Sequence, residues 1–296
     1  MQTSHSKKPF FLALACLSLA GLVSCNSSSE ASSDIVVSFY PLEFLASRIV
    51  GGKLSVSSIV PPGSEPHDFE LKTSDVMKLY DAKAVFLNGL GMEPFESSVK
   101  TNPNLGPKTT VLADSIDNLI TVVPSSGGSY VDPHIWLDTD IYATMGKTML
   151  DKIVTISPEN RALFESNYAS LVADLSTLKS YGQGLSLSGK TIAVSHDAFR
   201  YMGREFGFEE LFINGFSPND EPSASALQSL LDAIEEKGID TIFFEELENQ
   251  DIATYIATQT GAKVEVLSPL ETITEGENYI SVYRRNLDKI AEAKSK

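Results

Sequence analysis

The stretch of sequence most informative about the architecture is residues 157–184, which read SPENRALFESNYASLVADLSTLKSYGQG. Ser157 and Pro158 are typical of a helix start, because serine caps free amides and proline fits the first helical position. Apolar residues then recur every three or four positions, the spacing of one helix face. They are Leu163, Phe164, Tyr168, Leu171, Leu175 and Leu178. With Gly182 and Gly184 at the end, we expect one helix of about 24 residues and about 36 Å.

Short runs of β-forming residues alternate with amphipathic stretches on both sides of this helix. Before it, we expect strands at 35–39, 55–60, 84–87 and 110–112, and helices at 42–50 and 73–80. After it, we expect strands at 191–194, 211–213, 241–244 and 264–267, and helices at 198–206, 224–237, 252–260 and 279–293. Such alternation is typical of parallel sheets. The predicted fold class is therefore α/β: two lobes, each a parallel sheet flanked by helices, joined by one long, rigid linker helix.

The N-terminus is typical of an exported lipoprotein. Lys7 and Lys8 precede an apolar run at 10–23, which is shorter than the roughly 20 residues that a membrane-spanning helix needs. The run ends in LVSC at 22–25, which resembles a bacterial lipobox, although an ordinary secretory signal with an incidental cysteine is the alternative. We expect a lipoprotein signal peptide at 1–24, a lipidated Cys25, a flexible tether at 25–33, an N-terminal lobe at 34–156, the linker helix at 157–184 and a C-terminal lobe at 185–296.

Composition excludes several classes of protein. The 296 residues include 23 Lys+Arg and 39 Asp+Glu, which gives a net charge of −16. No basic stripe is present to bind nucleic acid. Cleavage before Cys25 would remove Cys16, and acylation would consume the thiol of Cys25. We therefore expect no disulfide, no thiolate metal site and no cysteine nucleophile.

One motif resembles a phosphate-binding loop but stands in the wrong structural context. Residues 184–191, GLSLSGKT, match the pattern G-x-x-x-x-G-K-[ST]. That loop binds phosphate only where a strand precedes it and a helix follows it. Here a predicted helix precedes the motif and a predicted strand follows it, so we reject nucleotide binding.

Three histidines lie at the ends of predicted elements. His67 comes after the strand at 55–60, His134 leads into a helix, and His196 directly follows the strand at 191–194. The carboxyl ends of strands in open α/β sheets face the ligand crevice. A lone histidine is more often an ordinary buried residue. Three imidazoles that converge in a cleft, however, suit Zn²⁺, which takes four nitrogen, sulfur or oxygen donors.

These observations do not decide which group is the fourth donor to the metal. The second lobe offers Glu245 and Glu246 after the strand at 241–244, and Glu271 after the strand at 264–267. Water is a further alternative. Each acidic residue taken alone is more often a solvated surface charge.

The chain resembles the metal-binding lipoproteins of bacterial ABC importers, in the group that carries zinc or manganese, from about residue 34 to 293. The sequence landmarks are GSEPHDFE (63–70), DPHIWLD (132–138) and HDAFRYMGREFGF (196–208), with EPSASAL (221–227), LSPLETIT (267–274) and YISVYRRNLDKIA (279–291) as weaker ones. The resemblance implies two α/β lobes joined by one long helix, with the metal site in the cleft between the lobes.

The resemblance also implies a ligand set. His67, His134 and His196 match the first three metal ligands of the family, and a histidine at the third position favours zinc over manganese. Many members have an aspartate where this chain has Ser268. Some zinc members use a glutamate just beyond, which corresponds to Glu271, with Glu245 or water as alternatives.

The implied function is that of an extracytoplasmic zinc-binding component of an ABC transporter. Such a protein delivers Zn²⁺ to a membrane permease and its ATPase, and needs no catalysis. We expect a monomer, lipid-anchored to the membrane on the periplasmic or outer face. The alternatives are a manganese or iron carrier of the same class, an adhesin, and an exported zinc hydrolase with Asp197, Glu65 or Asp68 as base. The absence of H-E-x-x-H disfavours the hydrolase.

Overall fold

The computed structural model describes residues 1–3, 32–123, 128–214, 223–245 and 250–295. The segment from residue 32 to 296 forms one compact unit. The predicted signal peptide beyond residue 3, Cys25 and most of the predicted tether lie outside the described residues, as do Glu246 and part of the loop at 123–130. Within the described ranges, no helix has both the length and the apolar character needed to cross a membrane.

The first half of the compact unit is built on a four-stranded parallel sheet with the order β2-β1-β3-β4. Its strands are β1 (Ile35–Val37), β2 (Val56–Ser58), β3 (Ala84–Leu87) and β4 (Thr109–Val111). The helices and 3₁₀ turns around it are α1 (Tyr40–Val50), α2 (Thr73–Asp81), α3 (Glu96–Thr101), η1 (Gly106–Lys108) and η2 (Leu112–Ser115). Every residue of β1 and β3 is buried, as expected for central strands covered on both faces.

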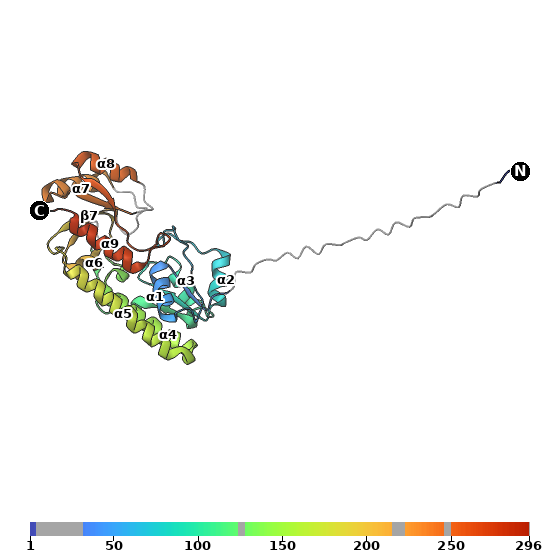
Figure 1. The fold of residues 1–296 in the computed structure, drawn as a ribbon. Coiled ribbons are helices and arrows are strands. Elements are labelled where there is room, and N and C mark those ends of the chain that lie inside the picture. Colours follow the sequence, from blue (N-terminus) through green and yellow to red (C-terminus); the bar gives the residue numbers. More distant parts are fainter. Residues whose placement is uncertain (4–31, 124–127, 215–222, 246–249, 296) are drawn as a thin grey trace. The chain divides into compact units, whose positions relative to one another are not determined.

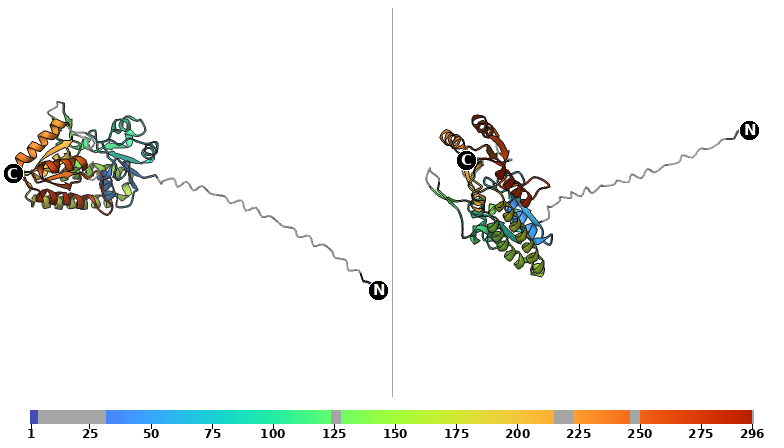
Figure 2. Two further views of the ribbon diagram at one scale, coloured as in Figure 1. Left: turned by 90° about the horizontal axis from the view of Figure 1, so that it is seen from above. Right: turned by 60° about the vertical axis from the view of Figure 1, so that its left-hand side comes forward.

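A run of mostly helical elements connects the two sheets. It contains the antiparallel pair β5 (Thr121–Val122) and β6 (Tyr130–Val131), then η3 (Ile135–Leu137), α4 (Thr139–Ile156), η4 (Pro158–Asn160) and α5 (Arg161–Gln183). Asp138 begins α4, because its side chain accepts the backbone N–H groups of Asp140 and Ile141. The long helix α5 packs against α4, α1 and α9 (Figures 1 and 2).

The second sheet is also parallel and has the order β10-β9-β7-β8. Its strands are β7 (Thr191–His196), β8 (Glu209–Asn214), β9 (Thr241–Phe244) and β10 (Lys263–Val266). Its helices are α6 (Arg200–Phe206), α7 (Ala224–Lys237), α8 (Gln250–Thr260) and α9 (Tyr279–Glu292). The predicted α/β class, with two parallel sheets and one long helix between them, is confirmed.

The linker helix differs from its prediction in three details. Ser157 and Pro158 begin the 3₁₀ turn η4, and α5 itself begins at Arg161. Leu163 is 38% exposed, so it does not belong to the buried face. The helix ends at Gln183, one residue before the predicted end, and within it Gly182 leaves room for the Phe206 ring, because a Cβ there would stand 2.4 Å from a ring carbon.

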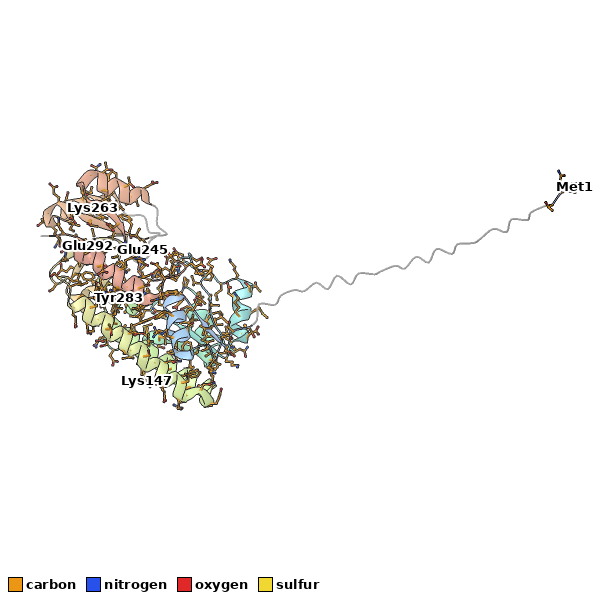
Figure 3. The ribbon with its side chains drawn as sticks, viewed as in Figure 1. Met1, Lys147, Glu245, Lys263, Tyr283 and Glu292 are labelled. Atoms are coloured by element: carbon orange, nitrogen blue, oxygen red, sulfur yellow. The ribbon has the colours of Figure 1, made fainter. Side chains whose placement is uncertain are left out.

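One hydrophobic core contains residues of both sheets and of α9, and a second, smaller core lies between the second sheet and helices α7 and α8. The Tyr279 ring stacks on Tyr142 of α4, with 4.2 Å between ring centroids. The hydroxyl of Tyr279 donates to the Trp136 carbonyl, and that of Tyr283, marked in Figure 3, donates to the Leu137 carbonyl. The last helix of the chain therefore ties the second sheet to elements of the first half.

Candidate metal centre

The three predicted histidines and Glu271 meet at one buried point. One possible ligand atom from each of these four residues lies within 4.8 Å of all the others. The Nε2 atom of His134 lies 3.2 Å from Nε2 of His67 and 3.2 Å from Nε2 of His196. The first half of the chain thus supplies two imidazoles, and the second half supplies one imidazole and one carboxylate.

His134 is held by a single carboxylate two residues earlier. Oδ1 of Asp132 accepts the backbone N–H of His134 at 2.9 Å and its Nδ1–H at 2.8 Å. This contact fixes the ring tautomer and leaves Nε2 to face the other histidines. Sequence reasoning missed this role for Asp132, although the residue stands within the quoted DPH motif.

The other two histidines are placed by the strands that precede them. His196 is the last residue of β7 and fully buried, so its side chain emerges at the carboxyl edge of the sheet. His67 lies in the loop after β2, where Oε1 of Glu65 accepts its backbone N–H at 3.0 Å. The Nδ1 atom of His196 forms a hydrogen bond with the carboxylate of Glu245, which follows β9.

Glu271 lies in a loop that hydrogen bonds hold in place beside the histidines. Asn286 of α9 donates to the Ser268 carbonyl at 2.6 Å, and the Trp136 indole donates to the Pro269 carbonyl at 2.7 Å. Leu270 adopts the left-handed conformation, with φ 64°, and is fully buried. Non-glycine residues adopt that conformation only where their surroundings enforce it. The carboxylate of Glu271 is therefore held in place from both halves of the chain.

The distances match a tetrahedral zinc site. Ligand atoms 2.0–2.1 Å from a tetrahedral ion stand about 3.3 Å from one another. Oε1 of Glu271 lies 3.4 Å from Nε2 of His134 and 3.7 Å from Nε2 of His67. Together with the two 3.2 Å imidazole separations, these values fit four donors around one ion.

Burial and mutual contact shift the pKa values of these groups in opposite directions. Burial lowers the pKa of His67 to about 3 against the opposing charge of Glu271. Burial also disfavours charge on His134, but hydrogen bonds to Asp132 and Glu271 raise its pKa to about 10. Burial would raise the pKa of Glu271, yet the His134 hydrogen bond and the neighbouring histidines hold it below its usual value. The ionised carboxylate of Glu271 is a suitable donor for a divalent cation, whereas His134 must lose its proton to bind one, because histidine binds a metal as the neutral ring.

A second group of acidic residues does not form a comparable site. Asp138, Asp140 and Glu205 also lie close together. However, Lys179 pairs with Asp140 and Glu205, and Arg204 pairs with Asp138. Two cationic side chains therefore already pair with these three carboxylates.

The remaining sequence candidates serve other contacts. Asp197 pairs with Arg200 and accepts the hydroxyl of Tyr130, and Asp68 is exposed. In the rejected phosphate motif, the Lys190 amine donates to the carbonyls of Ala291 and Ala293 at the end of α9. That lysine stabilises the fold, which agrees with the rejection.

Comparison with known proteins gives consistent matches. The family model described as "Zinc-uptake complex component A periplasmic" matches residues 35–293. The zinc-binding lipoprotein AdcA of Streptococcus pneumoniae is 30% identical over 96% of this chain. The high-affinity zinc uptake system protein ZnuA of Bacillus subtilis is 28% identical over 96% of each chain.

A solved structure with bound zinc is also similar. The Zn(II)-bound ZnuA-like domain of S. pneumoniae AdcA is 30% identical, with a TM-score of 0.74, over 88% of this chain and 98% of that domain. The present chain spans only 61% of the length of the full AdcA lipoprotein.

Proposed function

The chain belongs to the family of periplasmic zinc-uptake components, and from this premise we propose that it captures Zn²⁺ outside the cytoplasm and delivers it to an ABC importer. The observation that carries the proposal is the convergence of three imidazole Nε2 atoms and one carboxylate at tetrahedral spacing. The ion is cargo, so binding and release are the whole of the chemistry. His67, His134, His196 and Glu271 are the proposed ligands.

The donor set favours zinc over the alternatives. Imidazole nitrogen suits Zn²⁺, whereas Mn²⁺ prefers carboxylate, carbonyl and water oxygen. One carboxylate among four donors is a poor match for manganese. A catalytic zinc would need an open position for water, and four protein donors leave none. A binding role is therefore favoured over hydrolysis.

The partners follow from the proposed role. A permease would receive the ion, and its ATPase would drive transport. The lipobox-like LVSC at 22–25 supports an exported chain with a lipid at Cys25 as membrane anchor. A carrier that docks one-to-one is expected to be monomeric.

Zinc uptake by living cells tests the proposal. Host cells carrying the wild-type gene, a deletion, His134→Ala or Glu236→Gln would be given radioactive zinc at limiting concentration. Glu236 is exposed on α7, so its variant is the control for a substitution outside the proposed site. We expect His134→Ala cells to take up zinc no faster than the deletion strain, and Glu236→Gln cells to match wild type. Wild-type uptake in His134→Ala cells would contradict the proposal.

A further inference from the structure

Glu245 stands beside His196 because two neighbouring strands place it there. Strands β7 and β9 pair in parallel, with Ala193 opposite Ile242 and Val194 opposite Phe243. The same register, continued by two residues, places His196 opposite Glu245. Directly opposed residues of paired strands point to the same face of a sheet. The sheet itself therefore delivers a carboxylate to this histidine.

The contact uses the ring nitrogen that faces away from the proposed ion. Glu245 bonds to Nδ1 of His196, whereas Nε2 of the same ring lies 3.2 Å from Nε2 of His134. The two nitrogens lie on different edges of an imidazole ring. Among the described residues, the group whose ligand atoms converge consists of the three histidines and Glu271, and Glu245 does not belong to it.

Burial makes this contact strong. Glu245 is 7% exposed and His196 is fully buried, so water competes poorly for either group. Hydrogen bonds between charged or polar partners are stronger in such low-dielectric surroundings. Figure 3 labels Glu245 at the end of β9.

The arrangement repeats one already present at His134. There, Asp132 holds Nδ1 and Nε2 faces the centre. A carboxylate on the outer nitrogen of a metal-binding histidine fixes the tautomer, orients the ring and makes the inner nitrogen a better donor. His134 and His196 therefore have the same arrangement, with a carboxylate at Nδ1 and with Nε2 facing the centre.

We propose that Glu245 is a positioning residue that strengthens zinc binding through His196 and does not itself bind the ion. The inference rests on the proposed function, because it requires zinc at the histidine cluster. It assigns Glu245 a role different from that of a fourth ligand, which remains with Glu271.

Metal titration of full-length variants tests this role. Glu245→Gln, Glu245→Ala and the control Glu236→Gln would be stripped of metal and titrated with Zn²⁺ against a chromophoric chelator. Removing such an outer partner lowers metal affinity about 10–100-fold. We expect Glu245→Ala to lose more affinity than Glu245→Gln, and Glu236→Gln to match wild type. Unchanged affinity in Glu245→Ala would overturn the proposal.

Spectroscopy separates positioning from direct ligation. With Co²⁺ in place of Zn²⁺, we expect the absorption of a four-coordinate ion in wild type and in both Glu245 variants. In zinc-loaded, ¹⁵N-histidine-labelled protein, the Nδ1–H signal of His196 should shift in Glu245→Ala, while that of His134 should stay. A change of coordination number in Glu245→Ala would show direct ligation and overturn the proposal. Failure of the wild-type chain to bind zinc would instead refute the proposed function itself.

Discussion

At two of the three histidines, a carboxylate holds one ring nitrogen and leaves the other to face a common point. Asp132 does this for His134, and Glu245 does it for His196. Glu271, as the proposed fourth ligand, would supply negative charge to a buried divalent cation. These contacts hold both rings in one orientation, which reduces the conformational cost of binding an ion.

Removing the Glu271 carboxylate tests its proposed role as the fourth donor. We expect Glu271→Gln to lower zinc affinity by at least about a hundredfold, the upper end of what outer partners contribute. The reason is loss of the one anionic donor among the four. Competition titration against a chelator measures the effect.

Glu275→Gln provides the matched control, because Glu275 is an exposed glutamate four residues further along the same segment. Its zinc affinity should equal that of wild type. If Glu271→Gln binds zinc as tightly as this control does, another group or water completes the site. A water in that position would again support the alternative of a zinc hydrolase.

The pKa shifts predict that the metal-free chain loses stability as pH rises. His134, with a pKa raised to about 10 by Asp132 and Glu271 despite burial, and Glu65, raised to about 9 by burial and by Glu271, both stabilise the fold as long as they keep their protons. A raised pKa contributes stability that is lost as pH climbs through the folded value. We therefore expect the Tm of metal-free protein to fall from about pH 7 to about pH 9.

Zinc-loaded protein is the comparison for this pH series. A bound cation replaces the proton on His134 and supplies positive charge beside the carboxylates, so its Tm should change much less over the same interval. An equal fall in Tm in the metal-free and zinc-loaded proteins would contradict the stabilising role of the protons on His134 and Glu65.

The ligand residues could be predicted from sequence better than their supports. His67, His134 and His196 are the only histidines after residue 5, and each follows or precedes a predicted element. The roles of Asp132 and Glu245 depend on which ring nitrogen each one meets, which no local pattern encodes. Their status as ligands or supports stays a prediction until metal binding is measured.

At the scale of elements, strongly patterned segments were predictable and their ends were less so. The bounds of β3, β9 and α7 agree with the sequence in full, and the family resemblance is confirmed. The start of α5 was predicted too early, because residues 158–160 form the 3₁₀ turn η4 and the α-helix begins only at Arg161. Turns of 3₁₀ helix are frequent at the start of α-helices, and no local signal separates the two.

Helix α9 gives a test of how the two halves are fastened. We expect Tyr279→Phe to lower the free energy of unfolding by about 1–3 kcal/mol, because the Trp136 carbonyl loses its donor in a buried position. Urea unfolding measures this change. Tyr255→Phe is the matched control, since Tyr255 is 47% exposed on α8 and should unfold as wild type does. Equal stability of the two variants would show that the Tyr279 hydroxyl contributes nothing.

In the compact unit as a whole, one hydrophobic core contains residues of both sheets, and a second one lies between the second sheet and helices α7 and α8. The sequence predicts two lobes and a stiff helix, but not that α9 returns to pack on α4 and α5. Such contacts join residues far apart in the chain, and periodicity reports only which face of an element is apolar. The predicted limits of the lobes, 34–156 and 185–296, remain a prediction.

A shared core predicts small motion between the halves on metal binding. Helices α5 and α9 and the Trp136–Pro269 hydrogen bond cross between them, so a wide hinge would break buried contacts. We expect X-ray scattering profiles of metal-free and zinc-loaded protein to be nearly superimposable. A large compaction on zinc binding would contradict this expectation.

Competition titration would show whether the histidine cluster binds zinc as cargo. Metal-stripped full-length protein and His196→Ala would each be titrated with Zn²⁺ and with Mn²⁺ against a chromophoric chelator. The account predicts one tightly bound zinc per wild-type chain, much weaker manganese binding, and loss of tight zinc binding in His196→Ala. Manganese bound more tightly than zinc, or no tight binding of either ion, would contradict it.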